Sequence, residues 1–403
     1  MKRKLSVLAL LPLIALAGCN KEPTVEDAVS DLQPGQLPEN AEQISAMDVY
    51  NAFKDYQPNL LVDALEVEIS DLHASYSATI SDGTNTVSNL IALKDASAKI
   101  QVKGLTTAQS FNDLDAAVTA KASFDVNAAG ADTEAAQIAA MLNGKTFEAN
   151  AYLDSSKVYV HMNNELITEA GAPEGTPKDF YAAVPTDELN EELEDLGLTF
   201  PLLTQELIDM VMSEVNIPTE EELNEMLPEG LTLAKLETMA TSVLDEFFDF
   251  TKVDETYFAV AKLNKDNLTA KINTSIDHLN TAGVLSLMKG EEAVSTLPAE
   301  QVTEIKTMVA EQVTPMLAGL NDLSLSVAFD KAYGLRKLAF NLDYTMTSSY
   351  EGATQTGAIK AGATIAFKYN DEVTISFPDF SNYVNAETHP SFGGSADVEE
   401  EAK

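Results

Sequence analysis

Long segments in which apolar and polar residues alternate strictly constrain the fold of this chain more than any other feature of its sequence. They are clearest near the C-terminal end, at residues 323–329, 338–346 and 359–369. Successive side chains of a strand point to opposite faces of a sheet, so this period predicts strands with one apolar face. A last strand is expected from Val373, Ile375 and Phe377, before Pro378.

The N-terminal third of the chain has the same period, with one break in its phase. Leu65, Val67 and Ile69 alternate with polar residues, and residues 72–80 continue the alternation in the opposite phase. This pattern predicts one long strand with a β-bulge near Ser70-Asp71. Further strands are expected at residues 87–93, 98–105, 117–126, 146–153 and 157–162.

The middle third changes to a helical period. Helices are predicted at residues 188–196, 202–215, 220–227 and 231–250, with prolines between them. A shorter helix is expected earlier in the chain, at 44–56. After the middle third a strand pattern returns at 257–263 and 268–272, and a longer helix is expected at 299–317.

Together these patterns predict an α+β fold, in which one large curved antiparallel sheet of roughly ten strands packs with amphipathic helices. A flat open sheet of this size is unusual, so we expect it to bend deeply into a half-barrel or to split. The concave face of the sheet is the largest apolar partner for the helices. The predicted folded domain spans residues 43–383.

The N-terminal segment has the parts of a signal peptide. Lys2, Arg3 and Lys4 precede an apolar stretch, residues 5–16, which is shorter than the about 20 residues that a membrane-spanning helix needs. The stretch ends in Leu16-Ala17-Gly18-Cys19, and Cys19 is the only cysteine in the chain.

This ending resembles the lipobox of bacterial lipoproteins. The resemblance implies a signal peptide at residues 1–18, cleavage between Gly18 and Cys19, and lipidation of Cys19 with palmitate or similar chains, which anchors the protein to a membrane. The expected location is the extracytoplasmic cell envelope. Asn20 favours the outer membrane in a bacterium with two membranes, and the protein would face outward in a bacterium with one.

Two segments at the ends of the chain lack periodicity and are rich in acidic and polar residues. Residues 19–42 are expected to form a lipidated flexible tether, and residues 384–403 a disordered acidic tail.

The charge of the chain excludes several partners. The formal net charge is -39, and no basic stripe is present, so nucleic-acid binding is not expected. Close contact of the body with anionic lipid headgroups is disfavoured for the same reason. A single cysteine also excludes an internal disulfide.

No catalytic, metal or cofactor site is predicted. The four histidines are not spaced as metal ligands, and His161 is expected on the polar face of its strand. Ser286 and Lys289 match a Ser-x-x-Lys pattern, but the other motifs of the serine enzymes that use it are missing. The helical methionines Met210, Met212, Met226 and Met239 indicate either an adaptable core or a surface for an apolar ligand.

The order of anchor, strands, helices and strands resembles the bacterial lipoprotein carriers of the LolA and LppX type, in which helices close a half-barrel around a lipid. This resemblance is one of architecture over residues 44–383, and it implies a non-enzymatic protein that binds a lipid or another apolar molecule. The alternative is a lipoprotein with a filled core that acts as an interaction or envelope-structural module.

Overall fold

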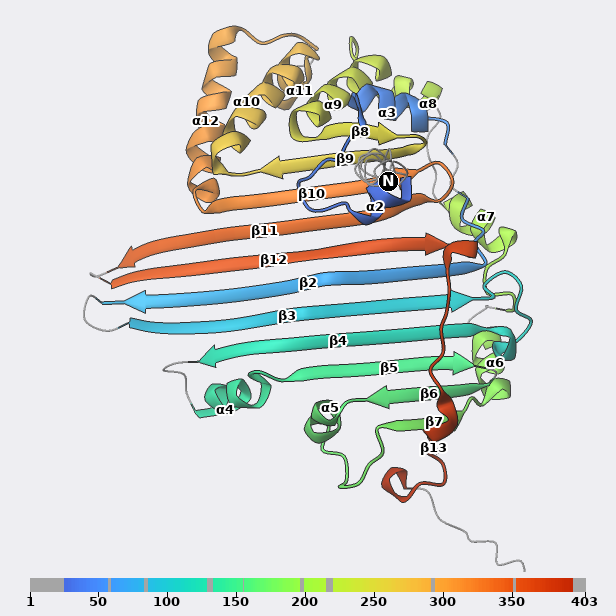
Figure 1. Cartoon of the computed structure of the whole chain (residues 1–403). Helices are drawn as coiled ribbons and strands as arrows, with labels where there is room; N and C mark the ends of the chain where they lie inside the picture. The colour runs from blue at the N-terminus through green and yellow to red at the C-terminus, as the bar shows by residue number, and fades with distance from the viewer. Residues whose placement is uncertain are drawn as a thin grey trace, which may run out of the picture.

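The protein is built on a single large β-sheet, which Figure 1 shows with its long strands lying side by side. The computed structural model describes residues 25–56, 59–82, 86–128, 133–154, 156–195, 199–214, 220–290, 294–350 and 353–393. Within these residues the chain is an α+β protein with 13 strands and eleven α-helices, as the α+β prediction required. Gly18 and Cys19 lie outside the described residues.

The sheet is almost entirely antiparallel. Its order is β1-β8-β9-β10-β11-β12-β2-β3-β4-β5-β6-β7-β13, and only the last pair is parallel. The strands are β1 (Glu42–Ile44), β2 (Ala64–Ser81), β3 (Thr86–Lys103), β4 (Asp115–Ala128), β5 (Thr146–Asp154), β6 (Lys157–Met162), β7 (Asp179–Ala183), β8 (Asp249–Val253), β9 (Thr256–Leu263), β10 (Leu320–Asp330), β11 (Gly334–Tyr350), β12 (Ala353–Tyr369) and β13 (Val384–Asn385).

The centre of the sheet is a seam between β2 and β12, two strands that lie far apart in the chain. They pair from Leu65 opposite Tyr369 to Ser81 opposite Thr354. The predicted bulge in β2 is confirmed, because the register shifts between Ile69 and Leu72, and Asp71 has a φ of +52°. A second bulge lies beside it in β3, where Asp95 has a φ of +49°.

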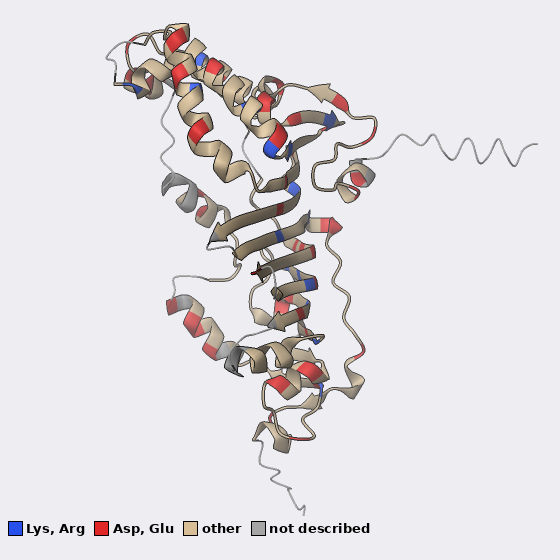
Figure 2. Cartoon of the chain, turned by 90° about the vertical axis from the view of Figure 1, so that its left-hand side faces the viewer, with Lys and Arg blue, Asp and Glu red and all other residues tan. Residues whose placement is uncertain are grey.

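One face of the sheet packs against helices at the β8–β10 end. In α3 (Ala46–Phe53), Ala46 joins Phe250 and Ala259 in a buried cluster, and the ring of Phe53 packs edge-on against Tyr257. Figure 2 looks along the strands and shows the long helices on this one side of the sheet. The other helices are α4 (Thr133–Leu142), α5 (Asn164–Glu169), α6 (Thr186–Asp195), α7 (Gln205–Glu214), α8 (Glu220–Met226), α9 (Leu233–Phe247), α10 (Lys265–Thr281), α11 (Val284–Met288) and α12 (Ala299–Leu317).

The opposite face holds the N-terminal segment from Val25 onward, contrary to the flexible tether expected for residues 19–42, of which residues 19–24 lie outside the described part of the chain. In α2 (Val25–Ser30) and just after it, Ala28 and Leu32 are buried against Phe258 and Ala328, both 0% exposed. Lys337 Nζ donates a hydrogen bond of 2.6 Å to the carbonyl oxygen of Ser30. The sequence signal was present but short, because Val25, Ala28, Val29 and Leu32 have the spacing of one helix face over only two turns, within a segment whose acidic and polar composition favoured a tether.

The C-terminal segment crosses the same face and replaces the predicted last strand at 373–377. Gln101 Nε2 donates to the carbonyl of Thr374 (2.9 Å), and Phe380 stacks on Tyr159 with ring centroids 3.6 Å apart. The tail prediction was also wrong for residues 384–393, since β13 pairs with β7 and Phe392 packs against Phe180. Aromatic residues, which act singly rather than in a period, hold this segment in place.

A buried carboxylate links this face to the sheet. Glu66 is 3% exposed and accepts hydrogen bonds from Gln101 Nε2 (2.6 Å) and Lys368 Nζ (2.7 Å). Burial alone raises the pKa of Glu66, but these hydrogen bonds and the charges of Lys368 and Lys99 outweigh it and lower the pKa below its ordinary value.

The curvature and one helix differ from expectation. The sheet is neither closed nor strongly curled, so the predicted half-barrel is not formed. Residues 268–272, predicted as a strand, lie in α10, because Asn264 caps a helix there and its side chain accepts from the backbone N–H groups of Asp266 and Asn267. The helix at 299–317 and the strand at 157–162 are confirmed with the predicted bounds.

Candidate functional site: an open apolar sheet face

Side chains of the long strands form continuous apolar rows on the face that packs against α3 and α9. Directly opposite residues in neighbouring strands share a face, so the pairings trace each row. One row runs Tyr344, Ile359, Tyr76, Ile91, Val126 across β11, β12, β2, β3 and β4. A second runs Phe367, Val67, Ile100, Val118, Ala151, Val160, Phe180 from β12 to β7.

Outside the two bulges, this face carries no charged residue from β2 through β5 or between Leu338 and Met346 of β11. The opposite face of the same strands carries Lys94, Lys99, Lys121, Asp125 and Glu148 among others. The alternation therefore separates charge from apolar surface over the whole middle of the sheet.

Helices do not cover this apolar surface in the middle of the sheet. Seven of its large apolar side chains are exposed, from 39% for Val87 to 60% for Ile91. The seven are Tyr76, Ile80, Val87, Ile91, Ile100, Val118 and Met346. We call this surface the open apolar face. Exposed apolar surface of this extent is characteristic of binding sites rather than of ordinary protein surface.

The ends of two helices border the open apolar face. At the C-terminal end of α12, the hydroxyl group of Tyr344 donates a hydrogen bond of 2.6 Å to the carbonyl of Met316. At the other side, α4 packs against β4 and leaves Ile138 and Met141 exposed. Met316 is also exposed, so flexible thioether side chains stand at both borders, where they adapt readily to ligands of varied shape.

The methionines singled out from the sequence are not one cluster. Met210 in α7 and Met226 in α8 are exposed, and Met239 is half-buried in α9. The side chain of Met212 lies outside the described residues. The sequence therefore indicated apolar helix surface but missed the sheet residues of the open apolar face. Their signal was present, since the charge-free phase of each strand is visible once the strands are aligned.

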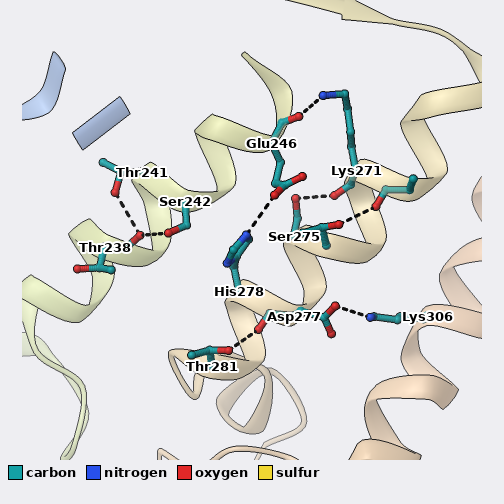
Figure 3. A network of polar contacts seen from close by, with 12 residues as sticks. Thr238, Thr241, Ser242, Glu246, Lys271, Ser275, Asp277, His278, Thr281 and Lys306 are labelled. Atoms are coloured by element: carbon teal, nitrogen blue, oxygen red, sulfur yellow. Dashed lines mark hydrogen bonds and ion pairs between the residues drawn. The ribbon is translucent and has the colours of Figure 1, made fainter. Parts of the chain in front are cut away.

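A groove of about 360 Å³ between α9 and α10 is a second candidate (Figure 3). It is lined by residues of both helices, among them Thr238, Ser242, His278 and Thr281. Its hydroxyl groups bond to their own helices, as Ser242 Oγ does to the carbonyl of Thr238 (2.7 Å) and Thr281 Oγ1 to that of Asp277 (2.9 Å).

Charged groups beside this groove make contacts between helices. Glu246 Oε1 lies 3.4 Å from His278 Nε2, and the carbonyl of Glu246 accepts from Lys271 Nζ (Figure 3). Asp277 Oδ2 accepts from Lys306 Nζ at 2.6 Å, which ties α10 to α12. These contacts fasten three helices together, and we assign the groove to packing.

The remaining sequence candidates also have structural roles. His161 lies on the polar face of β6, as predicted, with Nδ1 2.7 Å from Asp179 Oδ1. Ser286 is 0% exposed, and its hydroxyl donates to the carbonyl of Gly283 (2.8 Å) while accepting from the N–H of Ser295 (3.0 Å). Lys289 Nζ bonds instead to Gln301 Oε1 (2.8 Å), so the Ser-x-x-Lys pattern does not form a nucleophile and base pair.

Within the described residues, no three histidine, cysteine, aspartate or glutamate side chains gather as a metal site. None of the described helices has the length and apolar character needed to cross a membrane. Comparison with known proteins gives no further guidance, since no family model, curated protein or solved structure matches the chain.

Proposed function

We propose that this protein is a membrane-anchored, extracytoplasmic lipoprotein that binds the acyl chains of a lipid or a similar apolar molecule on the open apolar face. The observation that supports this most is the set of seven exposed apolar side chains on one charge-free face. A full burial of one such side chain is worth about 1.5–3 kcal/mol, so partial burial of several gives a useful affinity.

The dimensions of the face suit acyl chains. Five strands, β11 to β4, lie side by side there, and at about 4.8 Å per strand they span about 19 Å. This width accommodates extended hydrocarbon chains laid across or along the strands. The absence of charge leaves the headgroup of a lipid to lie at the rim, in water.

The anchor part of the proposal rests on the Leu16-Ala17-Gly18-Cys19 sequence. Lipidation of Cys19 supplies two or more chains, which suffices for stable attachment where one chain does not. Failure of labelled palmitate to enter the protein in cells, or unchanged membrane attachment of Cys19→Ser, would reject it.

The sheet is open and lacks the half-barrel that the resemblance to carriers of the LolA and LppX type implied, so the ligand part of the proposal rests on the exposed apolar side chains alone. The second candidate is an interaction module that uses the same face for another protein. Its support is also the exposed apolar surface, and the two candidates differ in what co-purifies with the protein.

The deciding experiment uses the chain from residue 20 onward, purified and extracted with organic solvent for mass spectrometry, followed by titration with a fluorescent fatty acid. We expect a co-purifying lipid and saturable probe binding. Ile91→Asp places a charge on the open apolar face and should weaken probe binding by about tenfold or more, the equivalent of at least about 1.4 kcal/mol.

Ser88→Asp is the matched control, since Ser88 is an exposed residue of the same strand on the opposite face. It should leave binding unchanged. Absence of both lipid and probe binding would reject the acyl ligand and leave the interaction module.

A further inference from the structure

The N-terminal segment fixes the direction from which the membrane anchor reaches the body. Phe258, Ala328 and Lys337, which α2 and the residues after it contact, alternate along their strands with residues of the helix-packed face. The segment is therefore attached to the face opposite the open apolar face.

Further contacts hold the segment there beyond α2. The N–H of Gly35 donates to Ser326 Oγ (2.9 Å), and that hydroxyl donates to the carbonyl of Gln33 (2.8 Å). Gly35 has a φ of +70°, and a Cβ at this position would collide with Ser324. The attachment is thus specific in backbone conformation as well as in apolar contact.

The chain between the anchor and α2 is short. Six Cα–Cα steps separate Cys19 from Val25, which at full extension span about 21 Å. To bring the anchor to the other face of the sheet, the chain would have to run from β10 past the edge strand β1. This path crosses three strand spacings, about 14 Å, and then the helix layer of α3 and α9, about 10 Å thick.

The route around the nearby strand ends is covered by the same helix layer. At the β10–β11 turn, Lys331 Nζ lies 5.9 Å from the ring centroid of Phe53 in α3. The open apolar face itself lies farther away, because Ile91 in β3 is four strand spacings from β10 in the sheet order, about 19 Å across the sheet, and on its other face.

We infer that the anchor holds the polar face toward the bilayer that carries the protein, and that the open apolar face exchanges acyl chains with a partner that arrives through the aqueous space. The partner is a soluble carrier or complex that presents an acyl chain, not the protein's own membrane. This inference rests on the proposed lipidation and on the proposed acyl ligand.

The geometry is tested with the full, lipidated chain in vesicles. Lipidation consumes the sulfur of Cys19, so Ile91→Cys supplies one free thiol for a fluorophore on the open apolar face, and Glu26→Cys supplies one in α2. With bilayer-embedded brominated lipids as quencher and an energy-transfer acceptor on the headgroups, we expect no quenching at position 91 and stronger energy transfer from position 26.

A variant with about 30 Gly and Ser residues inserted after Asn20 is the matched control, because its r.m.s. reach rises to roughly 30 Å and its full extension to several times that. Quenching at position 91 should then appear. Equal quenching at position 91 with the native spacing would overturn the inferred orientation.

The source of the ligand is tested separately. A pyrene-labelled fatty acid is offered either on cyclodextrin in solution or preloaded in the protein's own vesicles. We expect loading from cyclodextrin at least tenfold faster than from the vesicles, and the difference should shrink with the long insert. Equal loading from both sources would overturn the inference. Absence of loading from both, with the quenching result intact, would instead reject the proposed ligand while upholding the orientation.

Discussion

Gly35 and Ser324 are in such close contact that a Cβ atom on Gly35 would lie 2.8 Å from the Ser324 hydroxyl oxygen. Gly35 also has a φ of +70°, a conformation that costs an L-residue about 1–2 kcal/mol. We therefore expect Gly35→Ala to detach the N-terminal segment and to make the chain between α2 and β1 sensitive to protease.

Gly144 provides the control, since its φ is +74° and a Cβ there would meet nothing within 4 Å. Gly144→Ala should cost only the conformational strain in urea unfolding. An equal loss of stability in both variants would show that the contact with Ser324 has no weight.

Phe258 and Ile91 test which apolar residues form the core. Phe258 is fully buried beneath the N-terminal segment, so Phe258→Ala should lower the free energy of unfolding by about 3–5 kcal/mol. Ile91→Ala should change it by less than about 0.5 kcal/mol, because Ile91 is mostly in water. Chemical denaturation of both variants measures this, and a large loss for Ile91→Ala would mean that the open apolar face is structural.

Glu66 should make the protein sensitive to acid. Its folded-state pKa is held below the ordinary 4.5, so its contribution is complete above that value and is lost as the pH falls through the lower folded-state pKa. At neutral pH, Glu66→Gln should cost about 1–3 kcal/mol through the weaker hydrogen bonds with Lys368 and Gln101.

Glu68→Gln is the control on the same face of β2, where Glu68 pairs with Lys99 near the surface at 3.0 Å and should contribute less than about 1 kcal/mol. The difference between Glu66→Gln and the parent protein should shrink below pH 4.5 in urea unfolding curves. A constant difference across this range would contradict the assignment.

Tyr383 should make the C-terminal segment sensitive to alkali. Burial, with smaller contributions from the charges of Asp179 and Tyr152, raises its pKa to about 12. The unfolded chain loses this proton near 10, so the stabilisation by Tyr383 is complete below pH 10 and is lost as the pH rises toward 12. Burial also raises the pKa values of Tyr56, Tyr152 and Tyr369, so ultraviolet titration should show several late tyrosines, and Tyr383→Phe should remove the equivalent of one of them. An unchanged late titration in that variant would refute the prediction.

The strands and helices with a strong period could be predicted from the sequence, and those held by single contacts could not. The bulge at Asp71 could be predicted because the apolar residues of this strand change from odd to even positions on either side of it. The contact of Gly35 with Ser326 holds the N-terminal segment and the contact of Phe380 with Tyr159 holds the C-terminal segment, and neither Gly35 nor Phe380 belongs to a repeating pattern.

The candidate site was predictable in part. The apolar phase of strands such as 359–369 was evident, but the sequence assigned all of it to the interior, with helices as cover. Which apolar residues stay uncovered depends on where the helices pack on the sheet, and the bounds of a helix such as α12, although predicted correctly, do not give that position.

The seam between β2 and β12 imposes an order on biosynthesis. The ribosome delivers β2 through β7 first, and the strand that must complete the inner edge of β2 begins only at Ala353. Until then a strand of 18 residues is left with unsatisfied amide and carbonyl groups along one side. The nascent chain therefore needs either a chaperone that binds this unpaired strand or rapid synthesis and folding of the residues between β7 and β12. A truncation before residue 353 would yield aggregating fragments rather than a smaller folded unit.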